Sequence, residues 1–221
     1  MLKLGIDDAG RGPVIGPMVL AGCLIDTDIE KEFKKIGVRD SKTLSANKRK
    51  ILRDIIKEKA ISYKISITNP LEIDSFVGKK LNLNHLEAIK AAKIINKINK
   101  DNLKIEVAID CPSPSIEKWK SYLLQHIKNP DNLILKVEHK ADKNHPSVSA
   151  ASILAKTTRD REIEKIKKSI GIDFGSGYPS DPITIEFINK KAKKYSDSGI
   201  IRQSWQTWKN TKAKSEQKTL F

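Results

Sequence analysis

The chain has few of the features that mark secreted and membrane proteins. Its 221 residues include only two cysteines, Cys23 and Cys111, which lie far apart and form no metal-type spacing. We expect both to be buried thiols in a reducing compartment rather than a disulfide. No apolar run is long enough to span a bilayer, and the N-terminus runs into Leu2–Ile6 without a basic region or a cleavage site. The sequence therefore predicts a cytoplasmic protein without membrane contact, which we expect to be a monomer.

Acidic residues are outnumbered in this chain. There are 27 Asp and Glu residues against 42 Lys and Arg residues, which gives a formal net charge of +15. A basic excess of this size attracts polyanions, and nucleic acid is the commonest of them. The alternative is a lysine-rich composition that places Lys on every solvated surface. Charge alone leaves both explanations open.

Apolar segments alternate with segments of helical periodicity. Strands are predicted over Leu2–Asp8, Met18–Asp26, Ile61–Thr68, Leu103–Asp110 and Leu133–Glu138. Helices are predicted from Ser45 to about Ala60 and over Leu83–Ile98, Ile116–Ile127, Ser147–Ile170 and 183–195. The pattern predicts an α/β fold with a mixed sheet, because the first two strands form a hairpin and helices join the later ones. We expect residues 1–198 to form this domain and residues 199–221 a helical segment with a polar tail.

Acidic residues occur where three predicted strands end. Asp7 and Asp8 close the first, Asp110 closes a later one, and Asp142 lies just beyond the last. Such ends border the crevice in which open α/β sheets bind ligands. Carboxylates gathered there repel one another unless divalent cations neutralise them, and oxygen ligands without His or Cys suit Mg²⁺ or Mn²⁺. Asp110 or Asp142 taken singly is more often a structural turn residue, whereas the adjacent Asp7–Asp8 pair is less ordinary, because an acid in a core strand costs desolvation.

The glycine-flanked Arg11 follows the adjacent acids directly. Gly10 and Gly12 permit close backbone approach, so their N–H groups can reach a sugar or a phosphate. The Arg11 guanidinium can bind a phosphate with two parallel hydrogen bonds. A Gly-Arg-Gly sequence elsewhere would predict only a turn. Its position after two acids is what makes it a candidate substrate-binding segment.

Several long motifs in this order resemble ribonuclease HII in its archaeal form. They are "GIDDAGRGPVIGPMV", "DSKTLS", "VAIDCPSPS", "EHKADKNHPSVSAASILAKTTRDREI", "GSGYPSDP" and "RQSWQTW". The similarity extends from Leu2 to about Trp208. It implies a ribonuclease-H-like mixed sheet flanked by helices, with a helical C-terminal segment.

The resemblance also implies an activity and a set of site residues. The activity is a metal-dependent endonuclease that cuts the RNA strand of RNA–DNA hybrids, and ribonucleotides embedded in duplex DNA, leaving a 3′-hydroxyl and a 5′-phosphate. The family's metal-binding catalytic acids match Asp7, Asp8, Asp110 and Asp142. Its 2′-hydroxyl-reading motif matches Gly10, Arg11 and Gly12, and its sugar-packing tyrosine matches Tyr178. The implied cofactor is Mg²⁺ or Mn²⁺, with two ions taking part in phosphodiester hydrolysis.

One residue departs from the family pattern. The family usually has Glu at the second position of the opening pair, whereas this chain has Asp8, whose side chain is one methylene shorter. We expect activity to survive this change. Two rivals remain: a non-catalytic nucleic-acid-binding protein, and another metal nuclease or a recombinase on the same type of fold. The four retained acids argue against the first, and the "GSGYPSDP" and Gly-Arg-Gly elements against the second.

Other motifs keep two explanations each. Ser41 and Lys42 in "DSKTLS" either hold a phosphate or belong to the start of the following helix. Trp205 and Trp208 are expected in the core or at a hinge rather than as platforms for bases. In the tail, Gln217 and Leu220 have the Q-x-x-L spacing of sliding-clamp peptides, but the chain stops at Phe221 without the aromatic pair. The tail predicts either weak clamp contact or a solvated terminus.

Overall fold

The computed structural model describes residues 1–39, 41, 44–78, 81–100 and 103–217, with side chains described up to Ala213. Contacts divide the chain into two units. The first comprises Met1–Ala9, Val19–Ser66 and Asn84–Thr158, and the second Gly10–Met18, Ile67–Leu83 and Arg159–Phe221. The division into a domain of residues 1–198 and a C-terminal segment of residues 199–221 stays a prediction. Within the described ranges, no helix is both long and apolar enough to cross a membrane.

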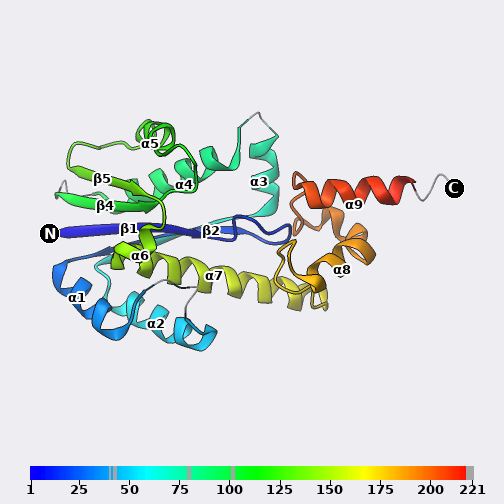
Figure 1. The fold of residues 1–221 in the computed structure, drawn as a ribbon, viewed down its shortest axis with the longest axis horizontal. Coiled ribbons are helices and arrows are strands. Elements are labelled where there is room, and N and C mark those ends of the chain that lie inside the picture. The colour runs from blue at the N-terminus through cyan, green and yellow to red at the C-terminus, as the bar shows by residue number, and fades with distance from the viewer. Residues whose placement is uncertain (40, 42–43, 79–80, 101–102, 218–221) are drawn as a thin grey trace. The chain divides into compact units, whose positions relative to one another are not determined.

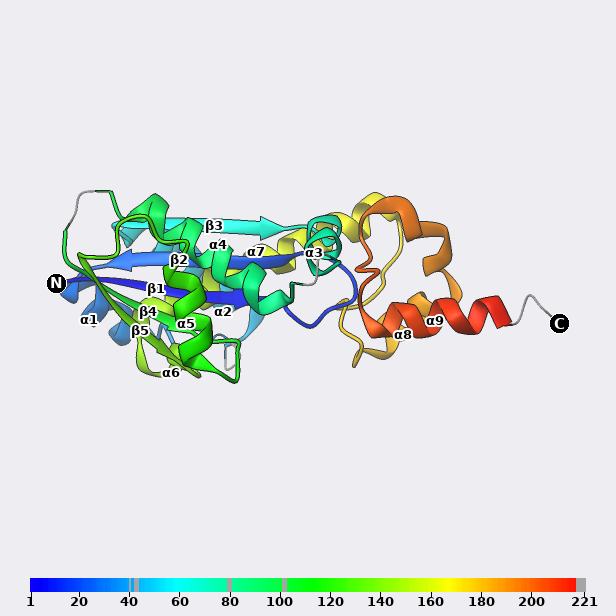
Figure 2. The same ribbon diagram turned by 90° about the horizontal axis from the view of Figure 1, so that it is seen from above.

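A five-stranded mixed sheet has the strand order β3-β2-β1-β4-β5 (Figure 2). The strands are β1 (Leu2–Ala9), β2 (Met18–Ile25), β3 (Ser62–Thr68), β4 (Ile105–Asp110) and β5 (Leu133–Glu138). β1 pairs antiparallel with β2, which confirms the predicted hairpin. β1, β4 and β5 run parallel to one another. Their carboxyl ends therefore lie at the same edge of the sheet.

Helices of the first unit cover both faces of the sheet (Figure 1). One face carries α4 (Leu83–Ile98) and α5 (Ile116–Leu124), and the other carries α1 (Thr27–Ile36), α2 (Ala46–Lys59) and the first half of α7 (Pro146–Ile170). The cluster on the α7 side includes Cys23, Phe33, Leu52 and Leu154, all fully buried. Both cysteines are buried free thiols, as predicted, and burial raises the pKa of Cys23 to about 12.

The second unit is built mainly from helices. It contains α3 (Pro70–Val77), the second half of α7, α8 (Pro182–Lys190), a 3-10 helix (Ala192–Ser198) and α9 (Gln206–Gln217). Its core gathers Val14, Ile15, Phe174, Phe187 and Trp208. The Trp208 side chain is buried in this cluster, as expected of a core residue.

Three of the described α-helices, α1, α3 and the four-residue α6 (Ala141–Asn144), were not predicted, and one prediction needs correction. The side chain of Asp26 caps α1 by accepting from the Ile29 amide at 2.9 Å, and Asn69 caps α3 by accepting from the Glu72 amide at 2.8 Å. The predicted helix over 183–195 is wrong in its second half. The α-helix ends at Lys190, and the chain continues as the 3-10 helix.

Candidate active site

The predicted acids gather at the shared carboxyl edge of β1, β4 and β5. Asp7 and Asp8 are among the last three residues of β1, and Asp110 is the last residue of β4. Asp142 lies in the short helix α6 (Ala141–Asn144), just after β5. The parallel pairing of the three strands is what brings these distant segments together.

Asp7 and Asp8 lie inside β1 rather than beyond its end. Asp7 is paired with Ala21 and Asp8 with Leu20, so the strand continues through both residues. Adjacent side chains on a strand point to opposite faces. Asp7 accordingly meets Ser152 of α7, while Asp8 lines a cavity with Glu87 of α4. The amide of Asp8 also donates to Asp7 Oδ1 at 2.7 Å.

The Asp7 carboxyl is held in a strongly perturbed state. It belongs to a residue only 7% exposed, and burial raises its pKa well above the ordinary value. The carboxylates of Asp8 and Asp110 raise this pKa further, whereas hydrogen bonds from Ser152 and from the Asp8 amide act in the opposite direction. The repulsion shows that Asp7, Asp8 and Asp110 share one electrostatic environment.

Asp142 is brought next to Asp110 by a tight turn. Lys140 is the one non-glycine residue in the described ranges with a positive φ, at 58°, and it turns the chain from β5 into α6. The amide of Ala141 then donates to Asp110 Oδ1 at 3.2 Å. The hydroxyl of Ser149 in α7 donates to the Asp142 carbonyl at 2.6 Å, which joins α6 to α7. Asp142 itself is buried, with 6% of its surface exposed.

Two residues at this site were missed by sequence reasoning. Glu87 is 1% exposed and lines a small cavity, about 10 Å³, together with Asp7, Asp8 and Asp110. Its signal was available, because it lies four and seven residues before Ala91 and Ile94 on the buried stripe of α4. Ser152 had no such signal, since its contact with Asp7 depends on how α7 packs against β1.

Ser41 is buried next to this network. Its hydroxyl lies 2.9 Å from the Ser152 hydroxyl. Either hydroxyl can donate to the other, and Ser152 in turn hydrogen-bonds Asp7. Ser41 therefore supports the orientation of Asp7 through Ser152. Its predicted partner in phosphate binding, Lys42, lies outside the described residues.

The donor set fits a hard divalent cation by charge and by chemistry. Carboxylate oxygens are the ligands that Mg²⁺ and Mn²⁺ prefer. The pKa of Asp7 is raised chiefly by burial and then by the charges of Asp8 and Asp110, which a cation would offset. Within the part of the chain that is described, no three acidic, histidine or cysteine side chains converge closely enough to hold an ion together. The four-residue ligand set therefore stays a prediction.

Four of the predicted substrate-binding residues, Gly10, Arg11, Gly12 and Tyr178, belong to the second unit. Gly10 has a φ of 83°, and a Cβ there would lie 2.7 Å from the Pro17 carbonyl oxygen, so glycine is required. A Cβ on Gly12 would lie 3.7 Å from the Tyr178 ring, which places this ring beside the Gly-Arg-Gly segment. The amide of Val14 donates to the Gly177 carbonyl at 2.9 Å and joins the two loops.

A buried arginine lies under the Tyr178 ring. Arg159 of α7 is 2% exposed, and its guanidinium carbon is 4.8 Å from the ring centroid. It also donates to the Ser176 carbonyl. Burial lowers the pKa of Arg159, although the group stays cationic at neutral pH. Arg159 thus fixes both the ring and the loop that carries it.

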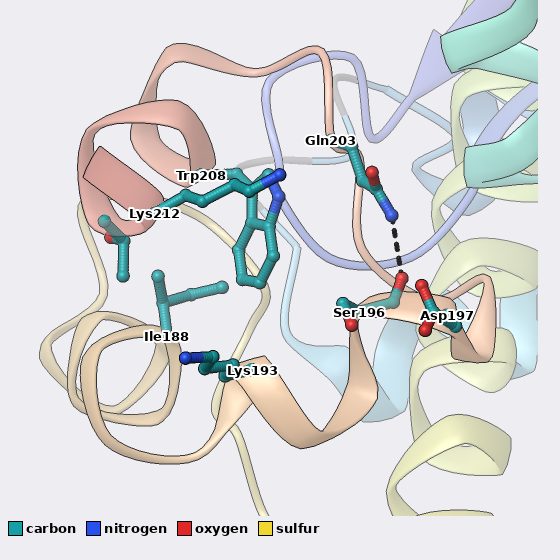
Figure 3. A pocket seen from close by; sticks show the side chains of 8 residues that line it. Ile188, Lys193, Ser196, Asp197, Gln203, Trp208 and Lys212 are labelled. Atoms are coloured by element: carbon teal, nitrogen blue, oxygen red, sulfur yellow. Dashed lines mark hydrogen bonds between the residues drawn. The ribbon is translucent and has the colours of Figure 1, made fainter. Parts of the chain in front are cut away.

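The second unit also contains a pocket of about 220 Å³, which is lined by other residues (Figure 3). Figure 3 shows the indole of Trp208 between Lys212 and Lys193, with Gln203 bonded to the Ser196 carbonyl at 2.8 Å. None of the predicted site residues lines it.

Comparison with known proteins identifies the family. A sequence model described as Ribonuclease HII matches residues 4–208. The chain is 42% identical to "Ribonuclease HII" of Methanocaldococcus jannaschii, over 100% of this chain and 99% of the relative. The chain belongs to the ribonuclease HII family. Ribonuclease HII of Pyrococcus furiosus is also 42% identical, over 98% and 95% of the two chains. As a member of this family, the chain is a metal-dependent endoribonuclease of the ribonuclease H type, as predicted.

Solved structures agree with the fold. The ribonuclease H2 of Pyrococcus horikoshii superposes with a TM-score of 0.86 at 37% identity, covering 98% of this chain and 99% of that one. A structure titled as the PCNA:RNase HII complex from Archaeoglobus fulgidus gives 0.78 at 35% identity, covering 93% and 96%. Bst-RNase HIII in complex with Mn²⁺ gives 0.79 at 20% identity, covering 98% and 71%, and supports the fold alone. The predicted mixed sheet with flanking helices is confirmed.

The presence of Asp8 where the family usually has Glu leads to a prediction. Asp8→Glu is expected to keep activity, and to raise it with Mg²⁺, because the longer side chain extends the carboxylate toward the shared site. Turnover should be measured with Mg²⁺ and with Mn²⁺ for the wild type, Asp8→Glu and Asp8→Ala. An inactive Asp8→Glu together with a fully active Asp8→Ala would mean that Asp8 is not a ligand.

Proposed function

We propose that this protein hydrolyses the RNA strand of RNA–DNA hybrids and cuts at ribonucleotides embedded in duplex DNA, in the cytoplasm. The products are a 3′-hydroxyl and a 5′-phosphate. The observation that carries the proposal is the shared carboxyl edge of β1, β4 and β5, which holds Asp7, Asp8 and Asp110 in one electrostatic environment. The basic excess of 42 Lys and Arg over 27 acids agrees with a polyanionic substrate.

The acids have a defined role in this mechanism. Asp7, Asp8, Asp110 and Asp142 are the residues that would hold Mg²⁺ or Mn²⁺. When bound, a pair of such ions supplies an activated water and stabilises the charge of an in-line displacement at phosphorus. The protein's own part is orientation: Ser41 and Ser152 fix the Asp7 carboxylate, and the Ala141 amide fixes that of Asp110. These bonds hold the carboxylates in place before substrate arrives.

Substrate recognition falls to the second unit. In our proposal the Gly10–Arg11–Gly12 segment reads the 2′-hydroxyl of the ribonucleotide, and the Tyr178 ring packs on the sugar of the following deoxynucleotide. The proximity of Gly12 to the Tyr178 ring supports a shared role. Lys42 completes the proposed set as a contact to a phosphate. Ser41 has its hydroxyl buried and bonded to Ser152, so its proposed part is the orientation of Asp7.

The direct test compares three duplexes of one sequence: plain DNA, DNA with a single ribonucleotide, and an RNA–DNA hybrid. Cleavage products are mapped by length and by end group. We expect cutting of the latter two only, dependent on Mg²⁺ or Mn²⁺, with a 3′-hydroxyl and a 5′-phosphate. Cleavage of the plain DNA at a comparable rate would refute the proposal.

Tyr178→Ala is expected to weaken cleavage at a single ribonucleotide by roughly tenfold, since stacking contacts contribute about 1–3 kcal/mol. Cleavage within a long hybrid should fall less, because the following sugar there is a ribose. Tyr178→Phe is the matched control, because it keeps the ring on Arg159. Initial rates on the two substrates provide the measurement. Equal losses on both substrates would make Tyr178 a general or structural contact.

A weak sliding-clamp contact is the proposed protein interaction. It rests on the Q-x-x-L spacing of Gln217 and Leu220, followed by Phe221. The Archaeoglobus fulgidus relative, whose structure is titled as a complex with PCNA, gives it support. In this chain the side chains involved lie outside the described residues.

A sliding clamp is expected to bind this chain weakly. Binding should be tighter when the tail is extended to a complete aromatic motif and weaker after Leu220→Ala. Calorimetric titration of the clamp against the three forms measures this. An extended form that does not bind would remove the tail from the functional account.

A further inference from the structure

Arg202 lies beneath the Gly-Arg-Gly loop and contacts its backbone at several points. The residue is fully buried, with 0% of its surface exposed. Its guanidinium donates to the carbonyl oxygens of Gly10 at 2.6 Å, Arg11 at 2.8 Å and Gly16 at 3.0 Å. Hydrogen bonds from a charged donor are stronger than neutral ones, and three of them fix both ends of the loop.

Trp205 completes the contact. Its indole Nε1 donates to the Gly12 carbonyl at 3.1 Å. The Arg202 guanidinium stacks on the same indole, with its central carbon 4.8 Å from the ring centroid. The two side chains therefore support each other while binding the three consecutive carbonyls of Gly10, Arg11 and Gly12 and that of Gly16 in the same loop. We call Arg202 and Trp205 the loop clamp.

The direction of these bonds determines which way the loop presents its amides. The described peptide bonds are trans, and in a trans peptide the C=O and N–H groups point in opposite directions. The units whose oxygens are held belong to Gly10–Arg11, Arg11–Gly12, Gly12–Pro13 and Gly16–Pro17. The last two have no N–H because proline follows. The loop clamp therefore orients only two N–H groups, those of Arg11 and Gly12, away from Arg202.

We propose that Arg202 and Trp205 are positioning residues that set ribonucleotide specificity by orienting the Arg11 and Gly12 amides toward the sugar. The inference rests on the proposed function, in which this loop reads the 2′-hydroxyl. Lysine in place of Arg202 keeps the charge but loses the planar arrangement of donors that reaches three carbonyls at once. Disrupting the loop clamp should therefore reduce the preference for a ribonucleotide more than it reduces the affinity for DNA in general.

The test measures affinity for a DNA duplex with one ribonucleotide against that for the all-DNA duplex of the same sequence. Both are measured with Ca²⁺, which carboxylates also bind. The proteins are wild type, Arg202→Lys, Trp205→Phe and Trp208→Phe. Trp205→Phe removes the donor to Gly12 but keeps an aromatic ring under Arg202. Trp208→Phe is the matched control, because Trp208 packs in the core of the same unit.

We expect a wild-type preference for the ribonucleotide duplex that falls roughly tenfold in Arg202→Lys, since small misplacements of binding groups have effects of this order. Trp205→Phe should lose part of the preference, and Trp208→Phe none, with all-DNA affinity unchanged in all three. If Arg202→Lys does not fold, Trp205→Phe decides. A wild-type preference that survives in Trp205→Phe and in any folded Arg202→Lys overturns this inference alone. A wild type without preference overturns the proposed function as well.

Discussion

Asp7→Asn and Asp110→Asn are expected to abolish metal-dependent cleavage, with a loss of roughly 10³-fold or more, because each removes a charged oxygen ligand from the site where transition-state charge develops. Both substitutions keep the shape of the side chain. The carboxylates of Asp7 and Asp110 each accept a hydrogen bond from a backbone amide, of Asp8 and Ala141 respectively. Turnover on a single-ribonucleotide duplex at saturating Mg²⁺ provides the measurement.

Asp7→Asn should increase the stability of the metal-free protein, although it abolishes activity. The pKa of Asp7 is raised in the folded protein, chiefly by burial, so the folded state holds this proton more tightly than the unfolded state. Wild-type stability therefore falls as the pH rises from the ordinary aspartate pKa through the raised one. At neutral pH, Asp7→Asn removes this penalty and should stabilise the metal-free protein. The gain should disappear in acid, where Asp7 is protonated in both states.

Asp131→Asn is a suitable control, because Asp131 is an exposed residue outside the site. It should leave both turnover and melting temperature unchanged. Full activity of Asp7→Asn or Asp110→Asn at saturating Mg²⁺ would contradict the metal-ligand assignment. A melting temperature of metal-free Asp7→Asn at neutral pH below that of the wild type would contradict the electrostatic account of Asp7.

Gly5→Ala should destabilise the protein by more than about 3 kcal/mol, a melting-temperature decrease on the order of 10 °C for a chain of this size. A Cβ on Gly5 would overlap the backbone of Ser147 and Val148, where α7 crosses the sheet in close contact with β1. Because backbone atoms cannot rotate aside, α7 must move away from β1. That movement would also separate Ser152 from Asp7, so any folded fraction should have reduced activity.

Gly37→Ala provides the comparison for this experiment. Gly37 has a φ of 83° at the end of α1, and a Cβ there would meet no atom within 4 Å. Only backbone strain of about 1–2 kcal/mol is expected. Thermal unfolding of the two metal-free variants should therefore separate them clearly. Similar melting temperatures would mean that α7 and β1 are less closely packed than the structure indicates.

Most of the fold was predictable because its signals are local. The apolar runs gave all five strands, and Ser45 caps α2 by accepting from the Lys48 amide at 3.2 Å, as predicted. The pattern also indicated that the later strands are joined through helices, from which the shared carboxyl edge follows. α1 and α3 were missed, although Asp26 and Asn69 are ordinary capping residues. Each helix is short, with ten residues in α1 and eight in α3.

The site was predictable only in part. Acids at strand ends and the family motifs indicated Asp7, Asp8, Asp110 and Asp142. The pairing of Ser152 with Asp7 depends on how α7 packs against the sheet, which no local pattern encodes, whereas the burial of Glu87 could have been predicted from the apolar stripe of α4. The contacts of Arg202 with Gly10 and Gly16 join residues more than 180 positions apart. Such long-range backbone contacts require the folded structure.

The most direct test of the central claim is to locate bound metal in crystals of this chain soaked with Mn²⁺. Anomalous scattering identifies the ions without reference to activity. The account predicts at least one Mn²⁺ bound by carboxylate oxygens of Asp7 and Asp110, with Asp8 or Asp142 completing the site, and no ion there in Asp110→Asn. Mn²⁺ bound only elsewhere, or bound unchanged in Asp110→Asn, would contradict the assignment of the acidic edge as the catalytic centre.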